Sequence, residues 1–134
     1  MKYLLDTNIC IYLIRQKPAH LRQRFASYSL PEIGISAITA AELHYGVERS
    51  SQPAKNRQAL ELFLLPLTIL GFDYSAVEAY GRVRAGLEAV GMPIGALDTL
   101  IAAQALIERL ILVTNNTREF VRVPGLVIED WTQP

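Results

Sequence analysis

Short runs of apolar residues alternate along the chain with longer segments in which apolar residues recur at helical spacing. The short runs predict strands at residues 3–5, 33–35, 67–70, 111–113 and 125–128. The longer segments predict helices at residues 7–15, 18–27, 36–49, 53–65, 74–90 and 96–109. Two residues support these bounds, because Pro53 suits the first turn of a helix and Gly91 suits the end of one.

This alternation predicts an α/β fold with a mostly parallel sheet that is covered by helices on both faces. The chain has 134 residues, and no repeat or linker-like segment divides it, so we expect a single domain over residues 1–134. In such folds, sites form just beyond the carboxyl ends of the strands. The residues that follow each strand are therefore the ones to inspect.

Four acidic residues stand at or near these positions. Asp6 follows the first strand, Glu42 lies in the helix after the second, Asp98 begins the helix before the fourth, and Glu119 follows the fourth. Each also has a purely structural interpretation. Asp6 can cap a helix, Asp98 suits a first helical turn, and residues 39–42 and 116–119 both have capping-box spacing.

The neighbours of two acids weaken the structural interpretation. If Ser36 caps its helix, Glu42 lies beyond the first turn, where no capping role exists. Asp98 shares a helix face with Ile101 and Ala102, and no lysine or arginine is near it in sequence. A carboxylate on such a face is unfavourable unless it is paired or bound to a metal.

Carboxylates that converge at one sheet edge repel one another unless a cation lies among them. Oxygen ligands favour Mg²⁺ or Mn²⁺ over Zn²⁺, and such a site suits phosphodiester hydrolysis. Spacing in the sequence alone leaves the convergence of these acids open.

Composition and charge narrow the function classes. Basic and acidic residues number 13 each, so any polyanion site must be a local patch. No apolar run reaches the roughly 18 residues of a membrane span, and the N-terminus has no signal-peptide pattern. Cys10 is the single cysteine and lies in an apolar run, which predicts a core position. We therefore expect a cytoplasmic protein without disulfides.

Four segments together resemble one known family. They are residues 4–8 (LLDTN), 36–43 (SAITAAEL), 98–103 (DTLIAA) and 113–120 (VTNNTREF). Their order and spacing resemble those of the PIN-domain ribonucleases, and more closely those of the VapC toxins of bacterial toxin–antitoxin pairs. The resemblance extends from Lys2 to about Trp131, which is nearly the whole chain.

The resemblance implies a three-layer α/β/α sandwich and RNA cleavage that depends on Mg²⁺ or Mn²⁺. Carried onto this sequence, the family's catalytic acids are Asp6, Glu42, Asp98 and Glu119, and its supporting polar residues are Thr7, Asn8 and Thr114. Asp6, Glu42 and Asp98 would be the metal ligands. Many relatives have aspartate in the fourth motif, so the role of Glu119 is the least defined.

The resemblance also implies partners. The first is a VapB-type antitoxin whose arginine-bearing tail blocks the acidic site. The second is another copy of the chain, in a homodimer. The third is an RNA substrate, for which the expected target is tRNA, including the anticodon stem-loop of initiator tRNA. Two other classes remain as alternatives. One is a non-catalytic binding module of a toxin–antitoxin repressor complex. The other, a phosphatase with an aspartyl-phosphate, is disfavoured because Asn8 stands where such enzymes carry a second acid.

Three further sets of residues have two interpretations each. The basic stretch at residues 15–24 can contact RNA phosphates or form a solvated helix face. Aromatic residues of the first half, for which we favour core packing over a partner groove, are Tyr12, Phe25, Tyr28, Tyr45 and Phe63. His20 and His44 lack zinc-ligand spacing and are predicted to lie at the surface or in packing positions.

Overall fold

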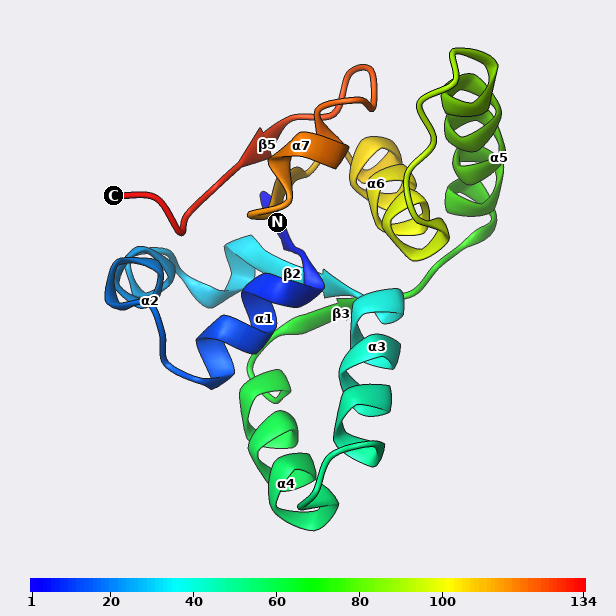
Figure 1. The fold of residues 1–134 in the computed structure, drawn as a ribbon. Coiled ribbons are helices and arrows are strands. Elements are labelled where there is room, and N and C mark those ends of the chain that lie inside the picture. The colour runs from blue at the N-terminus through cyan, green and yellow to red at the C-terminus, as the bar shows by residue number, and fades with distance from the viewer.

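The computed structural model describes residues 1–134 and contains one sheet of five parallel strands. The strands are β1 (Tyr3–Leu5), β2 (Ile33–Ser36), β3 (Thr68–Leu70), β4 (Ile111–Val113) and β5 (Ile128–Glu129). Their order across the sheet is β3-β2-β1-β4-β5, so β1 lies at the centre (Figure 1). The predicted α/β class and parallel sheet are confirmed.

Helices cover both faces of this sheet (Figure 1). They are α1 (Thr7–Ile14), α2 (Ala19–Ala26), α3 (Ala37–Glu48), α4 (Pro53–Leu64), α5 (Tyr74–Ala89), α6 (Ala96–Glu108) and α7 (Thr117–Phe120), and a 3₁₀ turn, η1, spans Leu30–Glu32. None of the helices has the length and apolarity needed to cross a membrane.

Side chains of the central strand divide between two apolar clusters. Tyr3 and Leu5 belong to a cluster with residues of α1, α3 and α4, whereas Leu4 belongs to a cluster with residues of α6 and α7. This division follows from the strand geometry, because successive side chains point to opposite faces. The two clusters give the predicted three layers, with the sheet in the middle.

Two features of the chain differ from the prediction. The last strand was expected at residues 125–128, but Gly125 has a positive φ of 81° and belongs to a turn, so β5 begins at Ile128. Helix α7 and the turn η1 were not predicted, because four and three residues are too few to show helical periodicity.

The direction of the chain connections changes at β1. Strands β2 and β3 lie on one side of β1, and β4 and β5 lie on the other. Because Leu5 pairs with Val113, the residues that follow these two strands, Asp6 and Thr114, lie beside each other. The backbone N–H of Asp6 donates to the carbonyl of Val113 at 2.9 Å. In parallel α/β sheets this change of direction opens a crevice suited to ligands.

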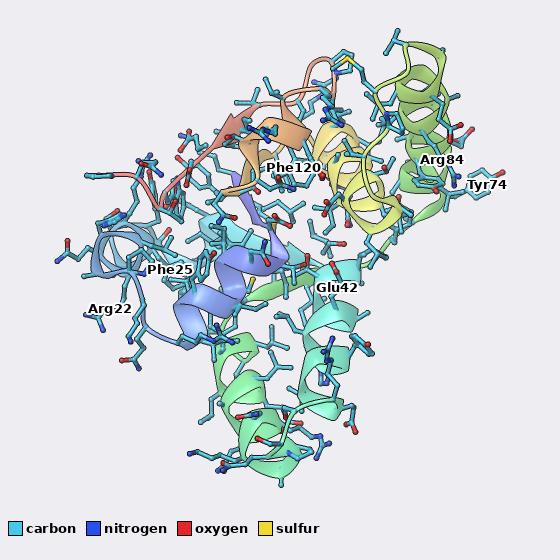
Figure 2. The ribbon with its side chains drawn as sticks, in the orientation of Figure 1. Arg22, Phe25, Glu42, Tyr74, Arg84 and Phe120 are labelled. Carbon is cyan, nitrogen blue, oxygen red and sulfur yellow. The ribbon has the colours of Figure 1, made fainter.

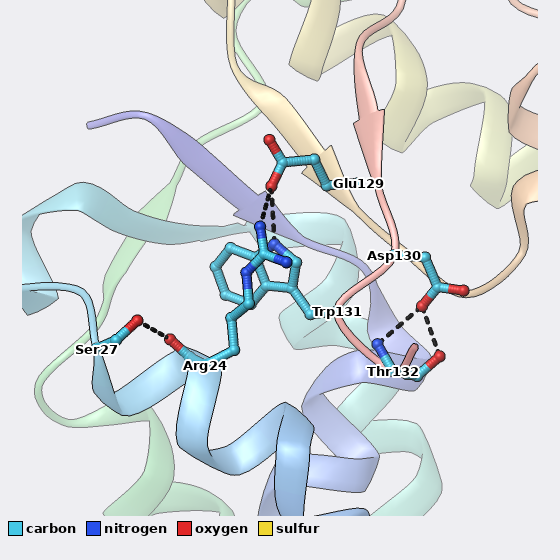
Figure 3. Close-up of polar contacts among 6 residues, drawn as sticks. All are labelled: Arg24, Ser27, Glu129, Asp130, Trp131 and Thr132. Carbon is cyan, nitrogen blue, oxygen red and sulfur yellow. Dashed lines mark hydrogen bonds and ion pairs between the residues drawn. The ribbon is translucent and has the colours of Figure 1, made fainter. Parts of the chain in front are cut away.

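The end of the chain is fixed to α2 through a buried tryptophan. Trp131 is fully buried and stacks on Tyr28, with ring centroids 5.0 Å apart. Its Nε1 donates to Glu129 at 2.9 Å, and Arg24 donates to the same carboxylate oxygen at 3.0 Å (Figure 3). The Arg24 guanidinium lies 5.4 Å from the tryptophan ring centroid. Arg24 therefore serves an internal contact rather than a free basic surface.

We expect Trp131→Ala to lower the free energy of unfolding by about 3–5 kcal/mol, because it deletes a large buried aromatic side chain. Arg24→Ala is the matched control. It removes only a partly exposed ion pair and one ring contact, so we expect a loss within about 1 kcal/mol. Urea unfolding measures both values, and equal losses in the two variants would contradict this account of the C-terminal segment.

Candidate active site

Asp6 lies between β1 and α1 and is only 4% exposed. One carboxylate oxygen accepts a hydrogen bond from the backbone N–H of Thr7 at 2.8 Å, and the other accepts from the hydroxyl of Thr114 at 2.8 Å. Burial raises the pKa of Asp6, the negative charge of Glu42 adds to that rise, and the two hydrogen bonds oppose it. Asp6 thus caps α1, as one interpretation proposed, and its second oxygen is oriented by a buried threonine.

Glu42 lies in the second turn of α3, close to the start of α1 (Figure 2). The helix is capped by Ser36, whose hydroxyl accepts from the N–H of Ile38 at 3.0 Å. Capping therefore does not explain Glu42, and the capping-box interpretation of residues 39–42 is wrong. Instead the hydroxyl of Thr7 donates to the Glu42 carboxylate at 2.8 Å and connects α1 to α3.

Asp98 lies in the first turn of α6 and is partly buried. Its pKa is raised to about 7, first by burial and then by the nearby carboxylates of Asp6, Glu119 and Glu42. All four predicted acids are thus close enough to influence one protonation equilibrium. Gly95 precedes this turn, and an added Cβ there would make only an ordinary van der Waals contact of 3.7 Å with the Asp98 carboxylate.

Glu119 belongs to α7, where its carboxylate accepts a hydrogen bond from the side-chain amide of Asn116 at 3.1 Å. Asn116 occupies the N-cap position but makes no side-chain capping bond, so the capping-box interpretation of residues 116–119 is also wrong. The N–H of Asn116 donates to the hydroxyl of Thr114 at 2.9 Å. Thr114 therefore contacts both Asp6 and the segment that carries Glu119.

Two contacts in this region were not anticipated from the sequence. One is the hydrogen bond from the side-chain amide of Asn116 to Glu119. The other is a hydrogen bond of 3.2 Å from the side-chain amide of Asn115 to the hydroxyl of Tyr12. The polar residues at 114–116 directly follow a buried strand, and that position was the available signal. The predicted supporting residue Asn8 is exposed in the first turn of α1.

None of the four acids has a basic partner. The ion pairs of the structure join Arg24 to Glu129, Arg57 to Glu48, and Arg84 to Glu88. No three acidic, histidine or cysteine side chains lie close enough together to enclose a metal ion in this structure. The donors are nevertheless all carboxylate and hydroxyl oxygens with uncompensated negative charge, which is the set that hard divalent cations prefer.

Five of the remaining candidates pack in or against the core. Cys10 is fully buried, which raises the pKa of its thiol and confirms its place in the core. Tyr12, Phe25, Tyr28 and Phe63 pack against the core as predicted. Tyr45 does not, because its side chain is 65% exposed. His44 is exposed and His20 is partly buried.

A groove of about 390 Å³ lies between α1, α3 and α4. Its apolar lining comes mainly from Ile11, Ile14, Leu43, Val47, Ala59 and Leu60. Glu42 and Arg15 also line it, so the groove reaches one of the four acids. None of the five aromatic residues considered for a partner groove contributes to its lining.

Comparison with known proteins places these observations in a family. Residues 3–126 match the PIN domain. This chain belongs to the PIN domain family. It is 45% identical to the tRNA(fMet)-specific endonuclease VapC of Shigella flexneri, over 98% of this chain and 99% of that protein.

Solved structures of VapC proteins have the same fold as this PIN domain. One is the DNA-bound VapBC complex from Salmonella typhimurium, with a TM-score of 0.93, 44% identity and coverage of 98% of both chains. Another is VapBC2 from Rickettsia felis bound to a promoter DNA fragment, with a TM-score of 0.90, 41% identity and coverage of 98% of this chain and 99% of that one. The resemblance inferred from four sequence motifs is thus confirmed.

The raised pKa of Asp98 predicts how the stability of this PIN domain depends on pH. The pKa of Asp98 is 3.8 in its ordinary state and about 7 in the folded protein, so between pH 3.8 and about pH 7 the folded state binds a proton that the unfolded state does not. Stability in EDTA should therefore rise as the pH falls from 8 to 5.

Asp98→Asn removes this titration. We expect the variant to unfold at a higher urea concentration than the wild type at pH 8, and the difference to shrink toward pH 5. Urea unfolding at four pH values in EDTA measures it. A difference that is constant with pH would show that Asp98 titrates normally.

Proposed function

We propose that this chain is a VapC-type toxin, an endoribonuclease that depends on Mg²⁺ or Mn²⁺. The observation that carries the proposal is the group of four carboxylates at the carboxyl end of β1 and β4, which interact electrostatically and have no basic partner. The identity to proteins named ribonuclease and tRNA(fMet)-specific endonuclease supports the same activity.

In this proposal Asp6, Glu42 and Asp98 hold the cation. A bound divalent ion supplies a nucleophilic hydroxide and neutralises charge on the scissile phosphate. This mechanism needs no nucleophilic side chain, which fits a chain whose single cysteine is buried in the core. Its contribution is to position oxygen ligands at the end of a rigid sheet.

Neighbouring hydroxyls and amides prepare the carboxylates for this role. Thr114 orients one oxygen of Asp6, and Thr7 orients Glu42, so both acids enter the site with fixed geometry. Asn116 holds Glu119 near Asp98. Because the pKa of Asp98 is about 7, cation binding near neutral pH releases a proton from this group.

The proposed substrate is tRNA, with the anticodon stem-loop of initiator tRNA as the first target to test. It is supported by the name of the Shigella flexneri relative. Single-stranded loops also suit the site, because their bases and phosphates are accessible without melting a duplex.

The proposed partner is a VapB-type antitoxin, and its proposed binding site is the groove between α1, α3 and α4. An apolar segment fits the groove lining, and an arginine carried by that segment would reach the Glu42 carboxylate. The structural relatives, which are VapBC complexes, support a VapB-type partner. Binding there would block the acids directly.

Cleavage of purified tRNA by the antitoxin-free protein tests the proposed activity. We expect a discrete product with Mg²⁺ and none with EDTA. Asp98→Asn should lower the cleavage rate by about a hundredfold or more, because it removes a charged ligand. Thr114→Val, which removes only the hydroxyl that orients Asp6, should lower it by roughly 10- to 100-fold.

Folding controls and RNA-binding measurements distinguish a ribonuclease from a non-catalytic binding module. Circular dichroism establishes that each variant is folded. Wild-type protein that binds tRNA but fails to cleave it with Mg²⁺ or Mn²⁺ would favour the non-catalytic binding module instead.

Ala59→Trp tests the groove. Ala59 is exposed on α4 and lines the groove, so an indole there would occupy space that the antitoxin needs. We expect binding of the co-expressed cognate antitoxin to weaken at least about tenfold, with RNA cleavage retained. Ala54→Trp is the matched control, because Ala54 is exposed on the same helix but lies outside the groove. Equal antitoxin affinity in the two variants would place the antitoxin elsewhere.

A further inference from the structure

An aromatic ring on the exposed face of α3 lies beside the cationic side chain of the residue that caps the end of this helix. Tyr45 is 65% exposed, and the guanidinium of Arg49 lies 5.8 Å from its ring centroid. Both residues lie on the helical stripe that begins at Glu42, since their spacings from Glu42 are three and seven residues. This stripe leads from the acidic site along the outside of α3.

The positive charge of Arg49 has no ion-pair partner. Of the three arginines that lie over aromatic rings, Arg24 is paired with Glu129 and Arg84 with Glu88. Arg49 forms no ion pair, and the adjacent Glu48 is already paired with Arg57. Arg49 is therefore a free cation in a chain of zero net charge.

The Tyr45 ring beneath Arg49 is also more exposed than the rings beneath Arg24 and Arg84. Trp131 is fully buried and cannot receive a planar ligand, and Tyr80 is only partly exposed. Tyr45 presents its side chain to solvent without contributing to either apolar cluster. An exposed tyrosine with a positive charge beside it is suited to a planar, anionic partner.

This surface is distinct from the groove proposed for the antitoxin. The α3 residues that line the groove are Glu42, Leu43, Gly46 and Val47, and neither Tyr45 nor Arg49 belongs to the lining. Glu42 is the residue common to both surfaces. A ligand on the Tyr45 side can therefore reach the acids without entering the groove.

We propose that Tyr45 and Arg49 form a stacking subsite for an unpaired RNA base beside the scissile phosphate. This inference rests on the proposed ribonuclease function. The helix rises about 1.5 Å per residue, which places Tyr45 about 4.5 Å and Arg49 about 10 Å beyond Glu42 along α3. The base stacks on the Tyr45 ring, and the Arg49 guanidinium contacts the phosphate that follows it.

Unpaired nucleotides are the occupant that these groups favour. Every base offers a π-face to an aromatic side chain. Each nucleotide also carries a phosphate, whose negative charge can pair with the Arg49 guanidinium. An apolar protein segment would use the ring but leave the guanidinium without a counter-ion. The subsite would thus help to select single-stranded loops over duplex RNA.

RNA binding by full-length protein in the Asp98→Asn background, in which cleavage is slowed, tests the subsite. The probe is an initiator-tRNA anticodon stem-loop with 2-aminopurine in its loop, whose fluorescence is quenched by stacking. Tyr45→Ala and Tyr45→Leu should weaken binding by about five- to a hundredfold and abolish the quenching, whereas Tyr45→Phe should retain both. Arg49→Gln should reduce the slope of log affinity against log salt by about one.

Tyr74→Ala is the matched control. Tyr74 is 75% exposed at the start of α5, but no cationic group lies over its ring, so its loss should leave binding unchanged. The same substitutions in the Asp98-containing protein should change cleavage in parallel, mainly through KM.

The outcomes separate the two proposals. Equal binding and quenching by the wild-type, Tyr45→Ala and Tyr74→Ala proteins, with metal-dependent cleavage intact, would overturn the subsite alone. Retained affinity in Tyr45→Leu would also overturn it, because apolar contact would then suffice. A Tyr45→Ala variant that changes oligomeric state but not RNA affinity would assign the ring to a protein contact. Absence of cleavage and RNA binding in the wild type would overturn both proposals.

Discussion

Parallel pairing of β1 with β4 determines where the chemistry of this protein can occur. The register that joins Leu5 to Val113 places Asp6 beside Thr114 and fixes one carboxylate through a buried hydroxyl. Thr7 then links the same point to Glu42 on α3. Three segments that are far apart in sequence are thereby held at one end of the sheet. A change of one residue in this register would point Asp6 to the other face and separate it from Thr114.

The same arrangement stores unfavourable electrostatic energy. The four carboxylates have no basic partner, and the negative charges of Asp6, Glu119 and Glu42 add to burial in raising the pKa of Asp98 to about 7. Two apolar clusters and the buried contact between Trp131 and Tyr28 offset this cost. A cation at the site would relieve the repulsion, so the feature that weakens the isolated fold is the feature that would bind metal.

The sequence predicted four of the five strands and the long helices because these depend on local patterns, and it selected the four acids by their positions near strand ends and by the resemblance of four motifs. Apolar runs identified β1 and β4, and the position of Asp6 and Glu119 after them indicated the candidate site. Short or long-range features could not be predicted in the same way. Helix α7 is a single turn, the contact of Asn115 with Tyr12 joins residues 103 positions apart, and the pairing of Arg24 with Glu129 depends on how the C-terminus packs. The exposure of Tyr45 likewise depends on which face of α3 the sheet covers.

Calorimetric titration of Mn²⁺ into the RNA-free protein tests most directly whether the acids form a cation site. Titrations in two buffers of different ionisation enthalpy also count the protons released. Stoichiometric binding is predicted, with close to one proton released at pH 6, much less at pH 8, and little at either pH in Asp98→Asn. Failure of the folded wild-type protein to bind Mn²⁺, or equal proton release by the wild type and the variant, would contradict the role assigned to these carboxylates.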